Sequence, residues 1–152
     1  MERAETKKEH AKSFEITRVD VWVGQIEDQP GAICEKLGGV MRAGADLDFM
    51  VARPLAEEPG KSVLFIAPLH GPEQEQAAKE VGLRKSRTQI LRVEGPDRPG
   101  LGAGLTCTLA GTGINICGLT ASVMCERCLF YLRFYSDDDL IRAAQILTRE
   151  LN

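Results

Sequence analysis

The chain has 152 residues, of which 43% are hydrophobic and 27% charged, and its formal net charge is −3. No apolar run approaches the roughly 20 residues that cross a bilayer, and the first ten residues lack the apolar segment of an export signal. Because the mild acidity also argues against a nucleic-acid binder, we expect a cytoplasmic globular protein with neither a membrane nor a nucleic-acid partner.

The first predicted elements are a strand and a helix, joined by a Pro-Gly turn. Alternation of apolar residues over 19–23 predicts the strand. Asp28 and Pro30 suit a helix start, because Asp can accept free backbone N–H groups and Pro has none to lose in a first turn. Apolar residues at helical spacing predict a helix over 33–41, and Gly44 stands where a helix ends in a left-handed residue.

A hairpin and a second helix follow along the chain. Alternation over 47–51 and an apolar run over 63–66 predict two strands, with a turn at 57–60 between them. Helical spacing then runs over 73–81. The order of elements is therefore β-α-β-β-α.

The second half of the chain repeats this pattern 69 positions later. Asp28-Gln29-Pro30-Gly31 returns as Asp97-Arg98-Pro99-Gly100, and Gly44-Ala45-Asp46-Leu47 returns as Gly113-Ile114-Asn115-Ile116, with no gap between them. Because several landmarks share one register, we interpret the chain as two copies of one unit. The second copy has predicted strands at 90–93, 116–123 and 129–135, a turn at 125–128, and helices that begin at 101 and 138.

Each copy lacks one strand of the β-α-β-β-α-β ferredoxin-like unit. Two short segments, 14–17 and 83–86, precede the first strand of each copy. We expect an exchange, in which 14–17 completes the second sheet and 83–86 completes the first. The predicted fold is α+β: two ferredoxin-like units in tandem, each an antiparallel sheet with helices on one face. The expected domains are a charged flexible tail (1–12), a first domain (13–83) and a second domain (84–152).

The segment from Arg92 to Leu101, with Gly113-Ile114-Asn115-Ile116 at the next strand, resembles an ACT domain, and the first copy is a looser version. ACT domains are small ferredoxin-like regulatory modules that bind amino acids. The two copies span 14–151, which is similar to stand-alone tandem ACT proteins, including the group around the glycine cleavage system repressor. The resemblance implies a non-enzymatic regulatory protein without catalytic residues, metal or cofactor, which senses an amino acid and signals through a protein partner or its own oligomer. The open sheet edges of such units also favour a homodimer.

The two Pro-Gly loops suit an amino acid on physical grounds as well. A turn into a helix exposes backbone N–H groups at the positive end of the helix dipole, where a carboxylate binds, and Asp or Asn oxygens can accept from an ammonium group. In ACT domains the ligand contacts the loop after the first strand and the start of the second strand. This maps the site to Asp28, Gln29, Pro30, Gly31, Ala32, Asp46 and Leu47 in the first copy, and to Asp97, Arg98, Pro99, Gly100, Leu101, Asn115 and Ile116 in the second.

Three residues depart from the usual ACT pattern. Asp46 replaces the usual Asn, and Gly102 and Gly104 stand in the second copy's first helix where bulkier residues are common. Either departure is consistent with one copy that has lost its ligand.

Two other interpretations stay open. The Asp-x-Pro-Gly loops are equally well explained as helix caps and turns, in which case the chain is a ligand-free interaction or dimerisation scaffold. Cys125 and Cys128 form a CxxC pattern that a thiol-based metal or redox sensor would use. That sensor is disfavoured, because the two thiols flank a predicted hairpin turn and supply only half of a four-thiolate zinc site.

Overall fold

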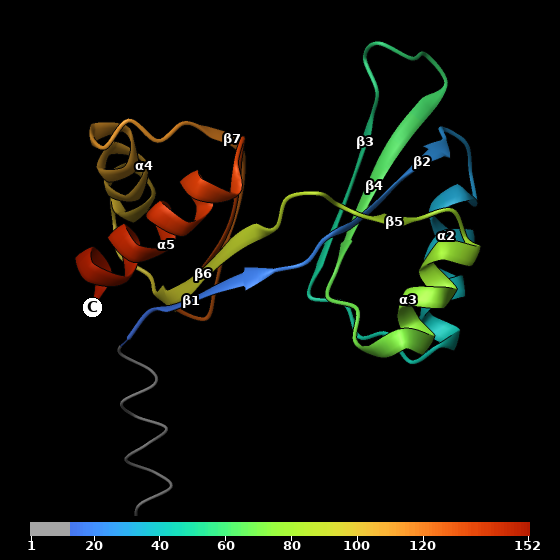
Figure 1. Cartoon of the computed structure of the whole chain (residues 1–152), viewed down its shortest axis with the longest axis horizontal. Coiled ribbons are helices and arrows are strands. Elements are labelled where there is room, and N and C mark those ends of the chain that lie inside the picture. Colours follow the sequence, from blue (N-terminus) through green and yellow to red (C-terminus); the bar gives the residue numbers. More distant parts are fainter. Residues whose placement is uncertain (1–12) are drawn as a thin grey trace, which may run out of the picture. The chain divides into compact units, whose positions relative to one another are not determined.

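The computed structural model describes residues 13–152 and divides the chain into two compact units (Figure 1). The N-terminal unit is Asp20–Arg87, and the C-terminal unit combines residues 13–19 with Thr88–Asn152. These units differ from the expected domains 13–83 and 84–152, because residues 13–19 belong to the C-terminal unit and the N-terminal unit extends to Arg87. The expected tail over 1–12 lies outside the described residues.

The N-terminal unit is a four-stranded antiparallel sheet with two helices on one face (Figure 1). The sheet order is β3-β4-β2-β5. A core of apolar side chains, including Trp22, Val40, Leu64 and Ile66, is buried between the sheet and the helices. Its elements are β2 (Trp22–Glu27), α2 (Ala32–Arg42), β3 (Phe49–Pro54), β4 (Lys61–Ala67), α3 (Gly71–Glu80) and β5 (Arg84–Lys85).

The C-terminal unit repeats this architecture with the order β1-β6-β8-β7. Its core is larger and contains Leu91, Leu109, Leu132, Phe134 and Leu147, each no more than 2% exposed. The elements are β1 (Glu15–Val19), β6 (Ile90–Pro96), α4 (Leu101–Gly111), β7 (Ile116–Met124), β8 (Arg127–Phe134) and α5 (Asp137–Leu151). No helix within residues 13–152 is both long and apolar enough to cross a membrane.

The predicted strand exchange is confirmed. Strand β1 pairs with β6, from Glu15 opposite Glu94 to Val19 opposite Ile90, and β5 pairs with β2, where Lys85 lies opposite Trp22. With these strands included, the first strand of each unit lies between its third and fourth strands, which is the ferredoxin-like order. The prediction of two tandem ferredoxin-like α+β units is confirmed with it.

Each exchanged strand is anchored by an apolar side chain that lies over a glycine. Phe14 lies over Gly95 and Leu83 over Gly24, and a Cβ on either glycine would collide with the side chain above it. Phe14 is also held by Asn152, which accepts from its N–H at 2.8 Å and donates to its carbonyl at 3.2 Å. By the repeat register Phe14 corresponds to Leu83, but Gly95 corresponds to Ile26 and not to Gly24, so the two edge strands pair with their neighbours two residues apart in register.

The single strand predicted over 19–23 is wrong. The chain leaves the C-terminal sheet at Val19 and enters the N-terminal sheet at Trp22, and residues 86–89 likewise separate β5 from β6. The alternation of Val19, Val21 and Val23 continues across the first break and so does not mark where the chain leaves one sheet for the other. Periodicity alone consequently cannot locate the point where a chain changes sheets.

Candidate functional site

The two Pro-Gly loops enter their helices through a glycine in the left-handed conformation. Gly31 (φ 90°) and Gly100 (φ 79°) are the N-cap residues of α2 and α4, and no side chain caps either helix. The prediction that Asp28 and Asp97 cap the helices is therefore wrong, and so is the placement of Pro30 and Pro99 in the first turns. The space around Gly31 and Gly100 is open, so the backbone angle is what requires glycine there.

Both loops are fastened to the neighbouring hairpin turn by one backbone hydrogen bond. The N–H of Asp28 donates to the Gly60 carbonyl at 3.0 Å, and the N–H of Asp97 donates to the Glu126 carbonyl at 2.9 Å. The side chains of both aspartates are exposed. Each unit thus presents a carboxylate and the uncapped start of a helix at the same end of its sheet as the hairpin turn.

The second half of each predicted site lies at the other end of the helix. Gly44 (φ 80°) and Gly113 (φ 77°) end α2 and α4 as predicted, and the chain then leads to Asp46 and Asn115. Helix α4 has 11 residues, so about 16 Å separates its start from its end. Within one unit, the structure therefore does not bring Asp97–Leu101 together with Asn115 and Ile116.

A groove of about 480 Å³ lies beside the start of β7. It is formed by Thr106 and Ala110 on α4 and by the stretch from Ile114 to Leu119. It contains Asn115 and Ile116 but none of the Pro-Gly loop. Thr106 and Ala110 are not among the predicted site residues, and their signal in the sequence is a spacing of four residues on one helix face.

The outer edge of the C-terminal sheet is unusually uncharged. Strand β7 has nine residues and contains neither a charge nor a proline, and it exposes Leu119, Val123 and Met124 by 50%, 60% and 77%. The equivalent edge strand β3 instead ends in Arg53 and Pro54. Charges and prolines are the usual protection of an edge strand against pairing, so β7 is the edge that is open to a further strand.

A polar cluster lies on strands β6 and β8, just before the second Pro-Gly loop. Glu94 accepts from the Arg92 guanidinium at 2.5 Å and from Arg127 Nε at 3.2 Å. Partial burial works to raise the pKa of Glu94, but the hydrogen bonds and charges of the two arginines outweigh it and hold that pKa below its usual value. The cluster therefore ties together the strand ends from which the loop emerges.

The two thiols of the CxxC pattern lie in different surroundings. Cys125 and Glu126 form the two-residue turn themselves, with φ of 50° and 61°, so the prediction that both cysteines flank the turn is wrong. Cys128 is only 1% exposed and lies 3.4 Å from the Gly95 carbonyl, and burial raises the pKa of its thiol. A raised pKa disfavours the thiolate that redox and metal chemistry require. Within residues 13–152, no three or more His, Cys, Asp or Glu side chains are grouped to hold a metal ion.

The sequence matches no protein-family model and no curated protein. Solved structures do resemble the fold. The protein BT0572 from Bacteroides thetaiotaomicron has a TM-score of 0.74 at 13% identity and covers 89% of this chain and 90% of its own. The ligand-free regulatory subunit of aspartate kinase from Thermus thermophilus has a TM-score of 0.59 at 17% identity and covers 90% and 97%.

A third structure, the aspartate kinase of Clostridium acetobutylicum, is described as an allosteric enzyme. Its TM-score is 0.57 at 12% identity over 91% of this chain, and the matched part is 34% of the enzyme. At such identities the likeness shows the fold alone. This chain therefore has the tandem ferredoxin-like, ACT-type fold that the regulatory parts of aspartate kinases also have.

Proposed function

We propose that this chain is a non-catalytic regulatory protein that binds a small amino acid and passes the bound state to a second copy or a protein partner. The fold supports a regulatory role, since the structures that resemble it include a regulatory subunit of aspartate kinase. The observation that carries the proposal is the combination of an uncapped helix start at Gly100 with the unprotected edge strand β7. The likeness to the glycine cleavage system repressor group stays a prediction from the sequence.

Pairing of β7 with the β7 of a second copy would join the two halves of the site. In an antiparallel pair, the start of one strand lies beside the end of the other. The end of β7 leads into the turn whose Glu126 carbonyl holds the Asp97 N–H. The groove at Asn115 in one copy would then adjoin the Asp97–Leu101 loop of the other.

The chemistry of the two halves is complementary to a free amino acid. The N–H groups at the start of α4 favour a carboxylate, because they carry the positive end of the helix dipole. The Asn115 side-chain oxygen and the Asp97 carboxylate can accept hydrogen bonds from an ammonium group. The groove beside Asn115 would take the ligand's side chain.

We expect the C-terminal copy, and not the N-terminal copy, to bind in this way. The edge strand β3 carries Arg53 and Pro54 and is protected against pairing. Asp46 stands at the position of Asn115, where Asn is the usual residue of the ACT pattern. We therefore assign the ligand to the C-terminal copy.

The test is thermal unfolding of the protein with each common amino acid in turn. An amino acid at about 100 times its Kd adds roughly 2.7 kcal/mol of stability, which raises the Tm by several degrees. We expect one or a few amino acids to do so, Asn115→Ala to reduce the shift, and the matched variant Asp46→Ala to leave it unchanged. An unchanged shift in Asn115→Ala would contradict the proposed site.

A ligand-free scaffold is the second candidate, and the exposed apolar side chains of β7 favour it. A scaffold would form dimers through β7 and would show no change of Tm with any amino acid. The oligomeric state measured by light scattering, with and without amino acids, separates the two functions.

A further inference from the structure

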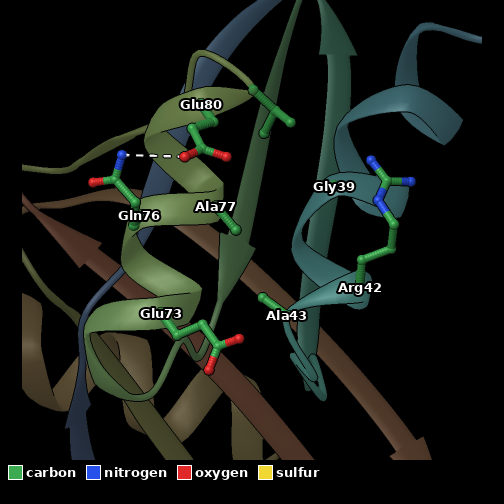
Figure 2. Close-up of a pocket in the computed structure, with 8 residues that line it drawn as sticks. Gly39, Arg42, Ala43, Glu73, Gln76, Ala77 and Glu80 are labelled. Carbon is green, nitrogen blue, oxygen red and sulfur yellow. Dashed lines mark hydrogen bonds between the residues drawn. The ribbon is translucent and has the colours of Figure 1, made fainter.

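We propose that the groove between α2 and α3 is a second small-molecule site, for a ligand that carries one carboxylate and at least one ammonium group. The groove has a volume of about 370 Å³, within the range of small-ligand pockets, and lies entirely inside the N-terminal unit. Its floor is made of the small residues Gly39, Ala43 and Ala77. Figure 2 shows Arg42 on the α2 side, and Glu73 and Glu80 on the α3 side.

The charges that line the groove are not used up by contacts within the protein. Neither Arg42 nor Glu73 forms an ion pair with any residue in the range 13–152. The Arg42 guanidinium lies over Gly38, where a Cβ would be 3.5 Å from its terminal nitrogen. The lining of the groove therefore includes one guanidinium on α2 and two carboxylates on α3.

Helix stability explains Arg42 and Glu73 in part, but it does not explain Glu80. A cation in the last turn of α2 and an acid in the first turn of α3 complement the helix dipoles. Glu80 is the last residue of α3, where the dipole disfavours a negative charge. Gln76 nevertheless holds its carboxylate with a hydrogen bond of 3.3 Å (Figure 2). Glu80 therefore stands at the groove against the preference of the helix dipole, held by a contact within its own helix.

The C-terminal unit closes the equivalent surface. By the repeat register, Ala78 corresponds to Leu147, and both are completely buried, so α3 and α5 can be compared directly. Arg142 then replaces Glu73, and it crosses to α4 and donates to the Thr112 carbonyl at 3.0 Å. Ile146 stands in the place of Ala77 and packs against the core. The open groove with its acids is consequently a feature of the N-terminal unit only.

The charge of the lining selects the ligand class. Two carboxylates and one guanidinium leave the groove with one net negative charge, so it suits a zwitterion or a cation that also carries a carboxylate. The ligand's carboxylate would pair with Arg42, which can bind it with two hydrogen bonds, and an ammonium group would pair with Glu80 or Glu73. A ligand with two carboxylates would meet repulsion from the α3 side.

The experiment is a titration of the full chain followed by amide NMR, with L-alanine, L-arginine and L-glutamate as zwitterionic, cationic and anionic probes. We expect L-alanine and L-arginine, up to about 10 mM, to shift the amide signals of Gly39, Ala43 and Ala77. L-Glutamate should bind about tenfold or more weakly. No shift at these amides with either of the first two probes would overturn the proposal.

Two variants connect such shifts to the groove. Ala77→Ile introduces the residue of the other copy and should remove the shifts by filling the floor. Glu80 is exposed, and Glu80→Gln keeps the shape of the side chain while removing its charge. This variant therefore tests the charge even if Ala77→Ile disturbs folding. It should weaken the binding of L-arginine about 10- to 100-fold. Its matched control is the exposed Glu57→Gln, with no expected change. Unchanged binding in both groove variants would refute the site.

The outcome is independent of the function proposed for β7. Asn115→Ala should leave the signals of Gly39, Ala43 and Ala77 responsive to both probes. A loss of these responses in Asn115→Ala would contradict a second site and assign the shifts to the first.

Discussion

Glu94 is the residue on which the ion-pair cluster of the C-terminal unit depends. Its carboxylate joins Arg92 and Arg127 across β6 and β8, and its side chain is 28% exposed. Hydrogen bonds to a charged group contribute about 1.5–3 kcal/mol, and the solvent access of Glu94 reduces this to about 1 kcal/mol. We therefore expect Glu94→Gln to lower the free energy of unfolding by about 1 kcal/mol at neutral pH, measured by urea unfolding.

The effect of pH on this variant follows from the lowered pKa of Glu94. In the unfolded chain the carboxyl has a pKa of about 4.3, and in the folded chain the two arginines hold it lower. A lowered folded pKa contributes stability that is fully present above the unfolded value and is lost as pH falls through the folded value. The difference between wild type and Glu94→Gln should consequently shrink below about pH 4, and a difference that stays constant to pH 2 would contradict this role.

At the scale of elements, β7 differs from β3 because its edge is not protected against pairing with a further strand. Val123 is 60% exposed, so a lysine there costs little within the unit and adds the charge that protects edge strands. If β7 pairs with a second copy, Val123→Lys should raise the Kd of the dimer about tenfold or more. Analytical ultracentrifugation measures this change. The control is Met50→Lys on β3, which is 55% exposed and should leave the oligomeric state unchanged.

Elements also show how far the sequence predicts this molecule. The strand exchange could be predicted because a register of 69 residues leaves each copy one strand short and leaves Phe14 and Leu83 without a place. The exact starts of the helices could not be predicted. The pattern Asp-x-Pro-Gly is compatible both with Asp as the N-cap residue and with a left-handed glycine as the N-cap residue. The grooves on α3 and α4 depend on how two elements pack, which no local pattern contains.

At the scale of the whole molecule, the exchange makes the C-terminal unit depend on a strand from the start of the chain, whereas the N-terminal unit is contiguous. The fragment 88–152 contains α4, α5 and three strands but lacks β1, so β6 would become an unpaired edge and Phe14 would be missing from above Gly95. Removing a buried Phe side chain alone costs about 3–5 kcal/mol, which is comparable to the stability of a small domain. We expect fragment 88–152 to unfold without a cooperative transition.

The structure also indicates how to restore that fragment. Phe14 is hydrogen-bonded to Asn152, so the start of β1 lies beside the end of α5. Fusing residues 13–19 after Asn152 through a short Gly-Ser linker gives a contiguous β-α-β-β-α-β unit, which should unfold cooperatively by circular dichroism. The same fusion with Phe14→Ala should lose most of that gain, since Phe14 is the fully packed side chain that segment 13–19 adds to the core, with Ile16 only partly buried against it. Cooperative unfolding of 88–152 without β1 would show instead that the exchanged strand is dispensable for the unit it completes.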